Sequence, residues 1–159
     1  MSALFCALVF VATWFAVPAG VLGNVNLGDA VILLGAWLLG GPWSIVAAAV
    51  GSCLADLANG YALYAPATLL IKALVAGVAL LLFRFLLGTR LPRTLALIFS
   101  ALAAELCMIA GYLLFEAFFL SLGAGALVSI PFNALQGLLS ILLAIPAYSL
   151  LSKTVFKAK

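Results

Sequence analysis

The sequence lacks histidine entirely and holds little charge, with four acidic and seven basic side chains in 159 residues. Its three cysteines, Cys6, Cys53 and Cys107, fall singly in apolar runs. An odd and scattered set of cysteines provides neither a disulfide framework nor the spacing of a metal site. We therefore interpret the cysteines as small core residues, and we do not expect metal-dependent catalysis.

Several catalytic and binding motifs are also missing. There is no Gly-x-x-x-x-Gly-Lys-Ser/Thr phosphate loop, so we do not expect the chain to hydrolyse ATP by that route. The sequence contains no Gly-x-Ser-x-Gly elbow, no basic stripe typical of nucleic-acid binding and no inverted repeat like those of many secondary transporters. These absences predict a protein that is not an enzyme, carries no cofactor or metal and binds no nucleic acid.

Apolar surface is what the sequence has in excess. Hydrophobic residues make up 69% of the chain, and the mean hydropathy is +1.41. This composition is that of a protein whose solvent is the lipid bilayer. The apolar runs are long and lack period-2 alternation, which favours helices over a membrane barrel. We predict an all-α protein of the cell membrane, a compact bundle of six transmembrane helices in a single domain over residues 1–159.

Proline and glycine residues divide the chain into six apolar segments. The first is interpreted as a transmembrane helix and not as a secretory signal, because no basic region precedes it. The second is short, since about 11 residues rise only ~17 Å against a hydrocarbon core of ~30 Å. The expected segments are 2–17, 29–39, 43–58, 67–87, 94–121 and 131–152, with a loop at 19–28 and a tail at 153–159.

The basic residues indicate how the bundle is oriented. With six spans, the connection between segments four and five lies on the same face as both termini. The connections on the other face contain neither lysine nor arginine. The positive-inside rule therefore predicts cytoplasmic N- and C-termini, with the polar stretches 23–29 and 56–68 on the outside. Six of the seven bases lie on the predicted cytoplasmic face, namely Arg84, Arg90, Arg93, Lys153, Lys157 and Lys159.

Lys72, the seventh base, lies inside segment four, ~9 Å below its outer end. A base within a span usually faces a cavity or a partner, although snorkelling to water is an alternative. Glu105, Tyr112 and Glu116 follow one another at spacings of seven and four residues and so share one face of segment five. Because Glu116 is level with Lys72, we predict a Lys72–Glu116 pair, which could lock two helices together or could also contact a ligand.

Segment six brings two amides, Asn133 and Gln136, to the same depth. Amides between membrane helices often serve packing alone, but four polar side chains from three helices at one level favour a binding site. Loop residues could cover it, although Asp29 could simply cap segment two and Asn59-Gly60 could simply form a turn. The predicted substrate-binding residues are Asn26, Asp29, Tyr61, Lys72, Tyr112, Glu116, Asn133 and Gln136.

Small residues recur at four-residue spacing in two segments. Ala3 and Ala7 are four apart in segment one, and segment three carries a run of alanine, glycine and serine between 47 and 55. Such faces let helices approach closely. On the residues alone, internal packing and the docking of another membrane protein are equally open.

Five stretches spread over nearly the whole chain carry a family likeness: Asn26-Leu27-Gly28-Asp29-Ala30-Val31, Gly51-Ser52-Cys53-Leu54-Ala55-Asp56-Leu57, Tyr64-Ala65-Pro66-Ala67-Thr68-Leu69-Leu70-Ile71-Lys72, Gly111-Tyr112-Leu113-Leu114-Phe115-Glu116 and Ile130-Pro131-Phe132-Asn133-Ala134-Leu135-Gln136-Gly137. Together they resemble the substrate-binding S components of energy-coupling factor (ECF) vitamin transporters. The branch they most resemble is the one assigned to hydroxymethylpyrimidine and pyridoxine-type vitamins.

The resemblance implies six helices and a vitamin site that opens outward, with ligand contacts under the loops after segments one, three and five. It also implies a partner module of one membrane scaffold protein, the T component, and two ATPase subunits. In that family, small residues on the first helices contact the T component, which makes Ala3 and Ala7 the expected docking positions. A loaded S component is thought to topple in the membrane and release its vitamin inside when ATP is used.

The sequence therefore predicts a high-affinity binding subunit of an ECF-type importer, with pyridoxine or hydroxymethylpyrimidine as the vitamin. Tyr112, Tyr61 or Trp14 could stack on the ring, and the opposite charges of Lys72 and Glu116 argue against a strongly charged ligand. Two alternatives stay open. The chain could be a non-transporting scaffold or assembly subunit, or an autonomous secondary transporter in which Glu105 carries a proton.

Overall fold

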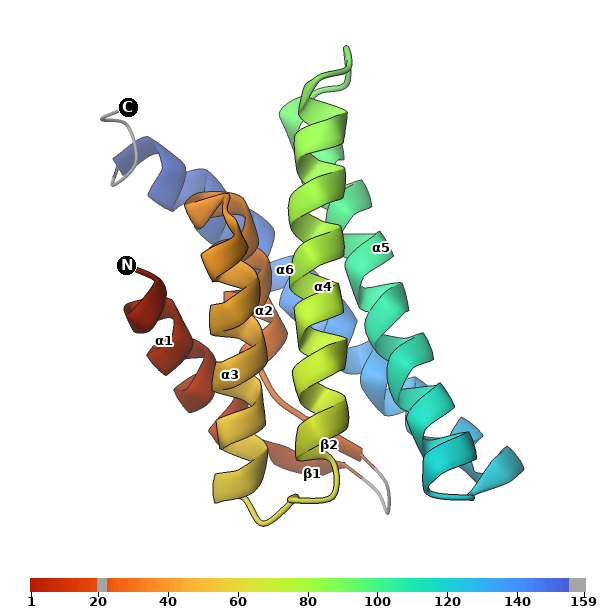
Figure 1. Cartoon of the computed structure of the whole chain (residues 1–159). Coiled ribbons are helices and arrows are strands. Elements are labelled where there is room, and N and C mark those ends of the chain that lie inside the picture. Colours follow the sequence, from red (N-terminus) through yellow and green to blue (C-terminus); the bar gives the residue numbers. More distant parts are fainter. Residues whose placement is uncertain (20–22, 155–159) are drawn as a thin grey trace.

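The computed structural model describes residues 1–19 and 23–154 and shows six α-helices around a shared core (Figure 1). The tail residues Lys157 and Lys159, on which the predicted orientation partly depends, lie outside the described residues. The helices are α1 (Ser2–Trp14), α2 (Gly28–Leu39), α3 (Pro42–Ala58), α4 (Ala65–Leu87), α5 (Arg93–Leu114) and α6 (Ile130–Thr154). Six helices were predicted, and their limits agree with the expected segments to within a few residues except at the ends discussed below.

The link between α1 and α2 contains a β-hairpin that was predicted to be a loop. Strand β1 (Val17–Ala19) pairs antiparallel with β2 (Gly23–Val25), with Val17 opposite Val25. Helix α1 ends at Trp14, three residues before the expected end. Pro18 explains this difference, because proline lacks a backbone N–H and disfavours helical conformation in the residue before it. The hairpin lies across the end of the bundle at which α4 begins (Figure 1).

Helix α2 lies in the middle of the bundle and packs against α1, α3, α4 and α6. Its 12 residues rise about 18 Å, so α2 is too short to cross the hydrocarbon core alone. Helices α1 and α3 are also short, whereas three continuous helical stretches are long and apolar enough to span a membrane: Ala65–Leu87, Arg93–Phe119 and Gly123–Thr154. The shortness predicted for segment two is thus a feature of the whole first half of the chain.

The small residues of α3 serve internal packing, which settles one of the alternatives left open by the sequence. Ala47, Ala48, Ala49, Gly51, Ser52 and Ala55 are all buried. Gly51 allows α1 to approach closely, since a Cβ at this position would lie 2.6 Å from the backbone oxygen of Cys6. By contrast, Ala3 and Ala7 on α1 are exposed.

The end of α5 departs from the predicted continuous helix. The α-helix stops at Leu114 and continues as a π-helical turn, η1 (Phe115–Phe119), which contains Glu116. Ser121 then adopts a positive φ of 57°, and a 3₁₀ helix, η2 (Gly123–Ser129), leads directly into α6. Segment five was expected to run to Ser121 and segment six to begin near Pro131. Only residues 120–122 between η1 and η2 are non-helical, because η2 forms most of the connection to α6.

Two ends of the bundle differ in chemistry. At the end drawn uppermost in Figure 1 lie the C-terminus of α4, the N-terminus of α5 and the end of α6, whereas α1 begins near mid-height. We call this the basic end, because it carries Arg84, Arg90, Arg93 and Lys153. The Arg84 guanidinium donates a hydrogen bond to the Gly40 carbonyl at the end of α2. The opposite end, which holds the hairpin, we call the hairpin end.

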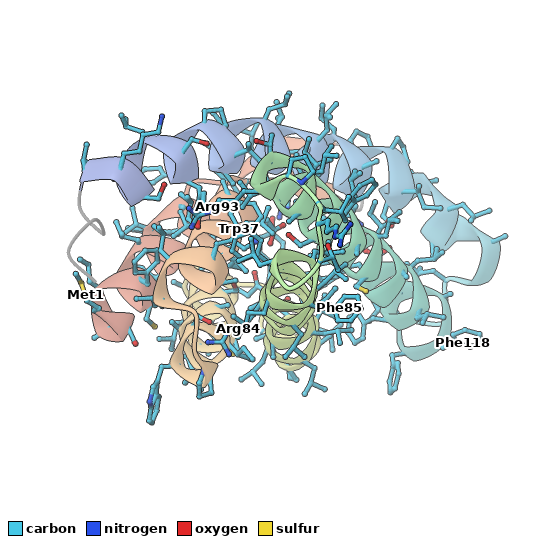
Figure 2. All side chains as sticks on the ribbon, turned by 90° about the horizontal axis from the view of Figure 1, so that it is seen from above. Met1, Trp37, Arg84, Phe85, Arg93 and Phe118 are labelled. Carbon is cyan, nitrogen blue, oxygen red and sulfur yellow. The ribbon has the colours of Figure 1, made fainter. Side chains whose placement is uncertain are left out.

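The apolar core lies nearer the basic end and contains a cluster of aromatic rings. Trp37 of α2 packs against Phe83 of α4 and Tyr148 of α6, with ring centroids 6.0 and 5.7 Å away. The Trp37 indole N–H donates a 3.2 Å hydrogen bond to the Ser100 hydroxyl. Figure 2 shows Trp37 in the centre of the bundle when it is viewed from the basic end. The polar groups in the other half, toward the hairpin end, are therefore supported by a well-packed apolar core.

Candidate substrate site

A cluster of three buried polar side chains joins α2, α4 and α6. The Lys72 ammonium lies 2.7 Å from Oδ1 and 2.8 Å from Oδ2 of Asp29. The Gln136 side-chain amide donates a 2.6 Å hydrogen bond to Oδ2 of the same carboxylate. Each of the three residues is at most 2% exposed. We call this set the Asp29 cluster.

The Asp29 cluster corrects the predicted partner of Lys72. Glu116 was the predicted partner because both residues were expected at the same depth, but Lys72 forms its ion pair with Asp29. Snorkelling of Lys72 to water is also excluded by its burial. Nor does Asp29 cap α2, since no side-chain cap is present at the start of that helix. A buried base next to a buried acid satisfies the requirement that charges inside a membrane be paired.

Gln136 also connects the Asp29 cluster to the segment that follows strand β2. Its side-chain oxygen accepts a 3.0 Å hydrogen bond from the backbone N–H of Asn26, just after β2. The Asn26 side-chain oxygen in turn accepts from the N–H of Gly28, at 2.9 Å. A side chain would not fit at Gly28, because a Cβ there would be 2.1 Å from the Thr13 hydroxyl oxygen. Contacts with Gln136 of α6 and with the end of α1 thereby hold the segment after the hairpin next to the ion pair.

Three polar contacts run along the α4–α5 interface beside this cluster. The Tyr64 hydroxyl lies 3.5 Å from a Glu116 carboxylate oxygen, and the Thr68 and Tyr112 hydroxyls are 3.0 Å apart. The Lys72 ammonium lies 5.3 Å from the centre of the Tyr112 ring, within the range of a cation–π interaction. Residues 64, 68 and 72 are four apart and therefore occupy one face of α4. The predicted stripe of Glu105, Tyr112 and Glu116 does face the interior.

Tyr64 lies in the connection before α4, and its surroundings keep its hydroxyl protonated. Partial burial and, next, the negative charge of Glu116 raise the pKa of Tyr64 to about 12. The phenol therefore remains a hydrogen-bond donor throughout the physiological pH range, which suits its position beside the Glu116 carboxylate.

Glu105 is the one acidic side chain of α5. It is 3% exposed, and both of its carboxylate oxygens lack a hydrogen-bond partner among the residues that the structure describes. Gly137 of α6 makes room for it, because a Cβ at that position would lie 3.0 Å from Oε2 of Glu105. Glu105 thus packs against Gly137, the residue that follows Gln136 on α6, and makes no hydrogen bond to the Asp29 cluster.

Not every predicted site residue joins these contacts. Asn133 is 9% exposed but makes no side-chain hydrogen bond within residues 1–19 and 23–154. Tyr61 is 41% exposed, and in the α3–α4 connection its backbone, not its ring, closes the turn by donating to the Asp56 carbonyl. The predicted Asn59-Gly60 turn is present, with a φ of 82° at Gly60. The Asn59 amide also donates to the Trp14 carbonyl, which ties this turn to the end of α1.

Thr68 was not among the predicted site residues. A single threonine in an apolar helix usually bonds to its own backbone, so its hydroxyl gave no reason to predict a contact with another helix. The usable signal was the four-residue spacing of Tyr64, Thr68 and Lys72, which matches the spacing of Tyr112 and Glu116 on the facing helix. Taken together, the buried opposite charges, amides and phenols form an arrangement suited to hydrogen-bonding an uncharged polar ligand, with no nucleophile–base pair among these contacts.

Residues 1–153 match the family model described as the S component of ECF-type riboflavin transporters. The chain belongs to this family. It is therefore a membrane-embedded, substrate-binding subunit of an ECF transporter and not a member of an enzyme family. S components associate with a T component and ATPases in such transporters. This membership favours the first of the three hypotheses drawn from the sequence over a scaffold subunit or an autonomous transporter.

A solved structure reported as "Structure and mechanism of the S component of a bacterial ECF transporter" has the same fold. The TM-score is 0.69 at 22% sequence identity, and the match covers 99% of this chain and 95% of the other. A comparison with curated proteins finds no significant match. The family description names riboflavin, so these comparisons do not support the hydroxymethylpyrimidine and pyridoxine branch expected from the sequence.

Proposed function

We propose that this subunit captures a water-soluble vitamin at the hairpin end, on the outside of the cell membrane, for ATP-driven import by its partners. In this orientation both termini and the basic end are cytoplasmic. The distribution of charge supports it, because the basic side chains in the described connections and helix ends lie at the end opposite the hairpin. The single observation that carries the proposed site is the Asp29 cluster, which places opposite charges and an amide from three helices beneath the hairpin.

The proposed substrate-binding residues are the eight expected from the sequence, now in two groups. Asp29, Lys72, Tyr112, Glu116 and Gln136 belong to the hydrogen-bonded clusters, with the Asn26 backbone joined to them. Among the described residues, Asn133 makes no side-chain hydrogen bond and Oε2 of Glu116 has no partner, so both have hydrogen-bonding capacity to offer a ligand, while Tyr61 is an exposed ring. Binding energy in such a site comes from hydrogen bonds to charged groups shielded from water.

Riboflavin is the ligand we propose first, because it is the vitamin in the description of the family that the chain matches. The Asp29–Lys72 pair sums to zero charge, which suits a neutral ring system with hydrogen-bonding edges better than an anion or a cation. Pyridoxine and hydroxymethylpyrimidine, suggested by the sequence motifs, are smaller neutral heterocycles that the same groups could bind. These three compounds are therefore the comparison set for a binding experiment.

The test is equilibrium binding of each vitamin to the purified full chain in detergent, with riboflavin followed by the quenching of its fluorescence. Loss of a hydrogen bond to a charged group weakens binding by roughly tenfold to a hundredfold. We expect Lys72→Ala and Glu116→Gln to show such losses. Arg90→Gln, which removes a charge at the basic end, is the matched control and should bind as the wild type does.

Each outcome has a defined meaning. Tight binding of riboflavin that pyridoxine fails to displace would assign the ligand. Preferential binding of pyridoxine or hydroxymethylpyrimidine would instead favour the branch suggested by the motifs. Unchanged affinity in both Lys72→Ala and Glu116→Gln, with both variants folded, would remove these residues from the site, and no binding of any of the three vitamins would contradict the proposed ligand class.

A further inference from the structure

A cavity of about 350 Å³ lies at the basic end, far from the proposed vitamin site. It is formed where α5 begins and α6 ends. Leu97 and Tyr148 form a buried, mainly apolar side of it. The remaining lining residues are all basic or hydroxyl-bearing: Arg93, Thr94, Ser149, Ser152 and Lys153.

The charge in this cavity is of one sign. Arg93 and Lys153 line it, whereas all four acidic residues of the chain, Asp29, Asp56, Glu105 and Glu116, are absent from its lining. Neither base has a carboxylate partner within the part of the chain that the structure describes. The two positive charges are therefore available to an anion from outside the chain.

Arg93 is held in position without being neutralised. Its guanidinium donates a hydrogen bond to the Tyr148 hydroxyl and lies 5.2 Å from the centre of the Tyr148 ring. In Figure 2, Arg93 lies beneath the C-terminal half of α6. A guanidinium has five N–H donors, so most of them remain free for phosphate oxygens.

The start of α5 adds donors at the same place. No side chain caps this helix, whose first residues, Arg93 and Thr94, both line the cavity. The first backbone N–H groups of a helix have no intrahelical acceptor, and the helix dipole favours negative charge there. The uncapped start of α5, a guanidinium and a lysine thus lie around one open pocket, and together they supply the kind of donors that bind a phosphate group.

We propose that this cavity binds the phosphate group of an anionic phospholipid. Its position favours a lipid over free phosphate, because the cavity is at the end of two long apolar helices, where lipid headgroups lie. Leu95 and Leu150, neighbours of lining residues in the sequence, are 38% and 65% exposed and provide apolar surface for acyl chains. Basic pockets between membrane helices are a known way of binding anionic headgroups.

The experiment is native mass spectrometry of the full chain released from detergent that contains equal amounts of phosphatidylglycerol and phosphatidylcholine. We expect the wild type to retain phosphatidylglycerol in preference to phosphatidylcholine. One base near the surface accounts for about a fivefold change in anionic-lipid binding, so Lys153→Gln should reduce retention by about fivefold. Arg90→Gln is the matched control, since it removes a base from the same end that does not line the cavity.

In this experiment, two results would overturn the proposal: equal losses in Arg90→Gln and Lys153→Gln, which would indicate general attraction to the basic end, or no preference over phosphatidylcholine. A second arm adds millimolar inorganic phosphate. Retention that persists in phosphate supports the lipid headgroup, whereas complete displacement would overturn the lipid and leave free phosphate as the ligand of the same groups. Circular dichroism of each variant shows that the helices are intact, so that a lost lipid cannot be attributed to unfolding.

Discussion

Lys72 binds both carboxylate oxygens of Asp29, at 2.7 and 2.8 Å, across 43 residues of sequence and between two helices of different length. Bringing two charges into a membrane protein interior is costly, and the cost is offset only when their geometry and remaining hydrogen bonds are satisfied. Gln136 supplies one of those remaining bonds. The pair thus fixes the short helix α2 against the long helix α4 directly beneath the hairpin.

Removing one member of this pair should destabilise the protein strongly. Asp29→Asn and Lys72→Met each leave a buried group without its partner, at a cost of about 3–5 kcal/mol. The double variant Asp29→Leu/Lys72→Met removes both charges of the pair, and we expect it to be more stable than either single variant. The midpoint of thermal unfolding in detergent measures this, and a double variant less stable than both single variants would argue against the pairing.

Gln136 should control the order of the hairpin. In Gln136→Leu the Asn26 backbone N–H loses its acceptor, so its amide hydrogen should exchange with solvent faster. Asn133→Leu is the matched control, because Asn133 lies one turn away and makes no side-chain hydrogen bond among the described residues. Hydrogen exchange followed by mass spectrometry over the hairpin should therefore change in the first variant and stay the same in the second. Equal exchange in both would show that Gln136 does not hold the hairpin.

The Thr68–Tyr112 contact allows a clean measurement of one hydrogen bond inside the bundle. Tyr112→Phe removes only the phenolic oxygen, and Thr68→Val keeps the shape of the side chain. We expect each single variant to lose about 1 kcal/mol of stability and the double variant to lose less than the sum of the two. Additive losses in this double-mutant cycle would mean that the two hydroxyls, 3.0 Å apart, do not stabilise one another.

Local sequence signals predicted the helices well, because the length of an apolar run between proline and glycine residues fixes a membrane helix. They also placed Lys72 and the Glu105–Tyr112–Glu116 stripe inside the bundle, since charges avoid lipid. The hairpin was missed because its strands are only three residues long and contain none of the alternation that marks a strand. Such a short pair is stable only through its contacts with the rest of the chain.

The partner of Lys72 could not be derived from depth alone. Asp29 and Glu116 were both near the outer end of a segment, and the choice depends on how α2 lies within the bundle. That position follows from Gly28, which lets α2 approach the end of α1, and from Gln136 on α6. Helix-to-helix arrangement is a tertiary property, and the spacing of residues within one segment does not contain it.

Gly28 itself should tolerate no side chain. A Cβ at this position would lie 2.1 Å from the Thr13 hydroxyl oxygen and 2.9 Å from the Asn26 side-chain oxygen, so Gly28→Ala must displace the Thr13 and Asn26 side chains. We expect a loss of about 1–3 kcal/mol from this overpacking, with partial recovery in Gly28→Ala/Thr13→Ala. Gly77→Ala is the control, since its Cβ would meet Ile45 at an ordinary 3.8 Å. A Gly28→Ala variant as stable as the Gly77→Ala variant would contradict the close approach.

Ala3 and Ala7 are exposed on α1, as they must be if they dock the T component. Ala3→Leu/Ala7→Leu adds bulk to a face on which close approach of another helix is expected, so it should prevent co-purification with the T component and the ATPases. Vitamin binding by the isolated subunit should stay unchanged, because α1 contributes no side chain to the Asp29 cluster. Ala110→Leu, an exposed alanine on α5, adds bulk elsewhere and should leave the complex intact. If the α1 variant co-purified with its partners as well as the Ala110→Leu control does, the docking surface would have to lie on another helix.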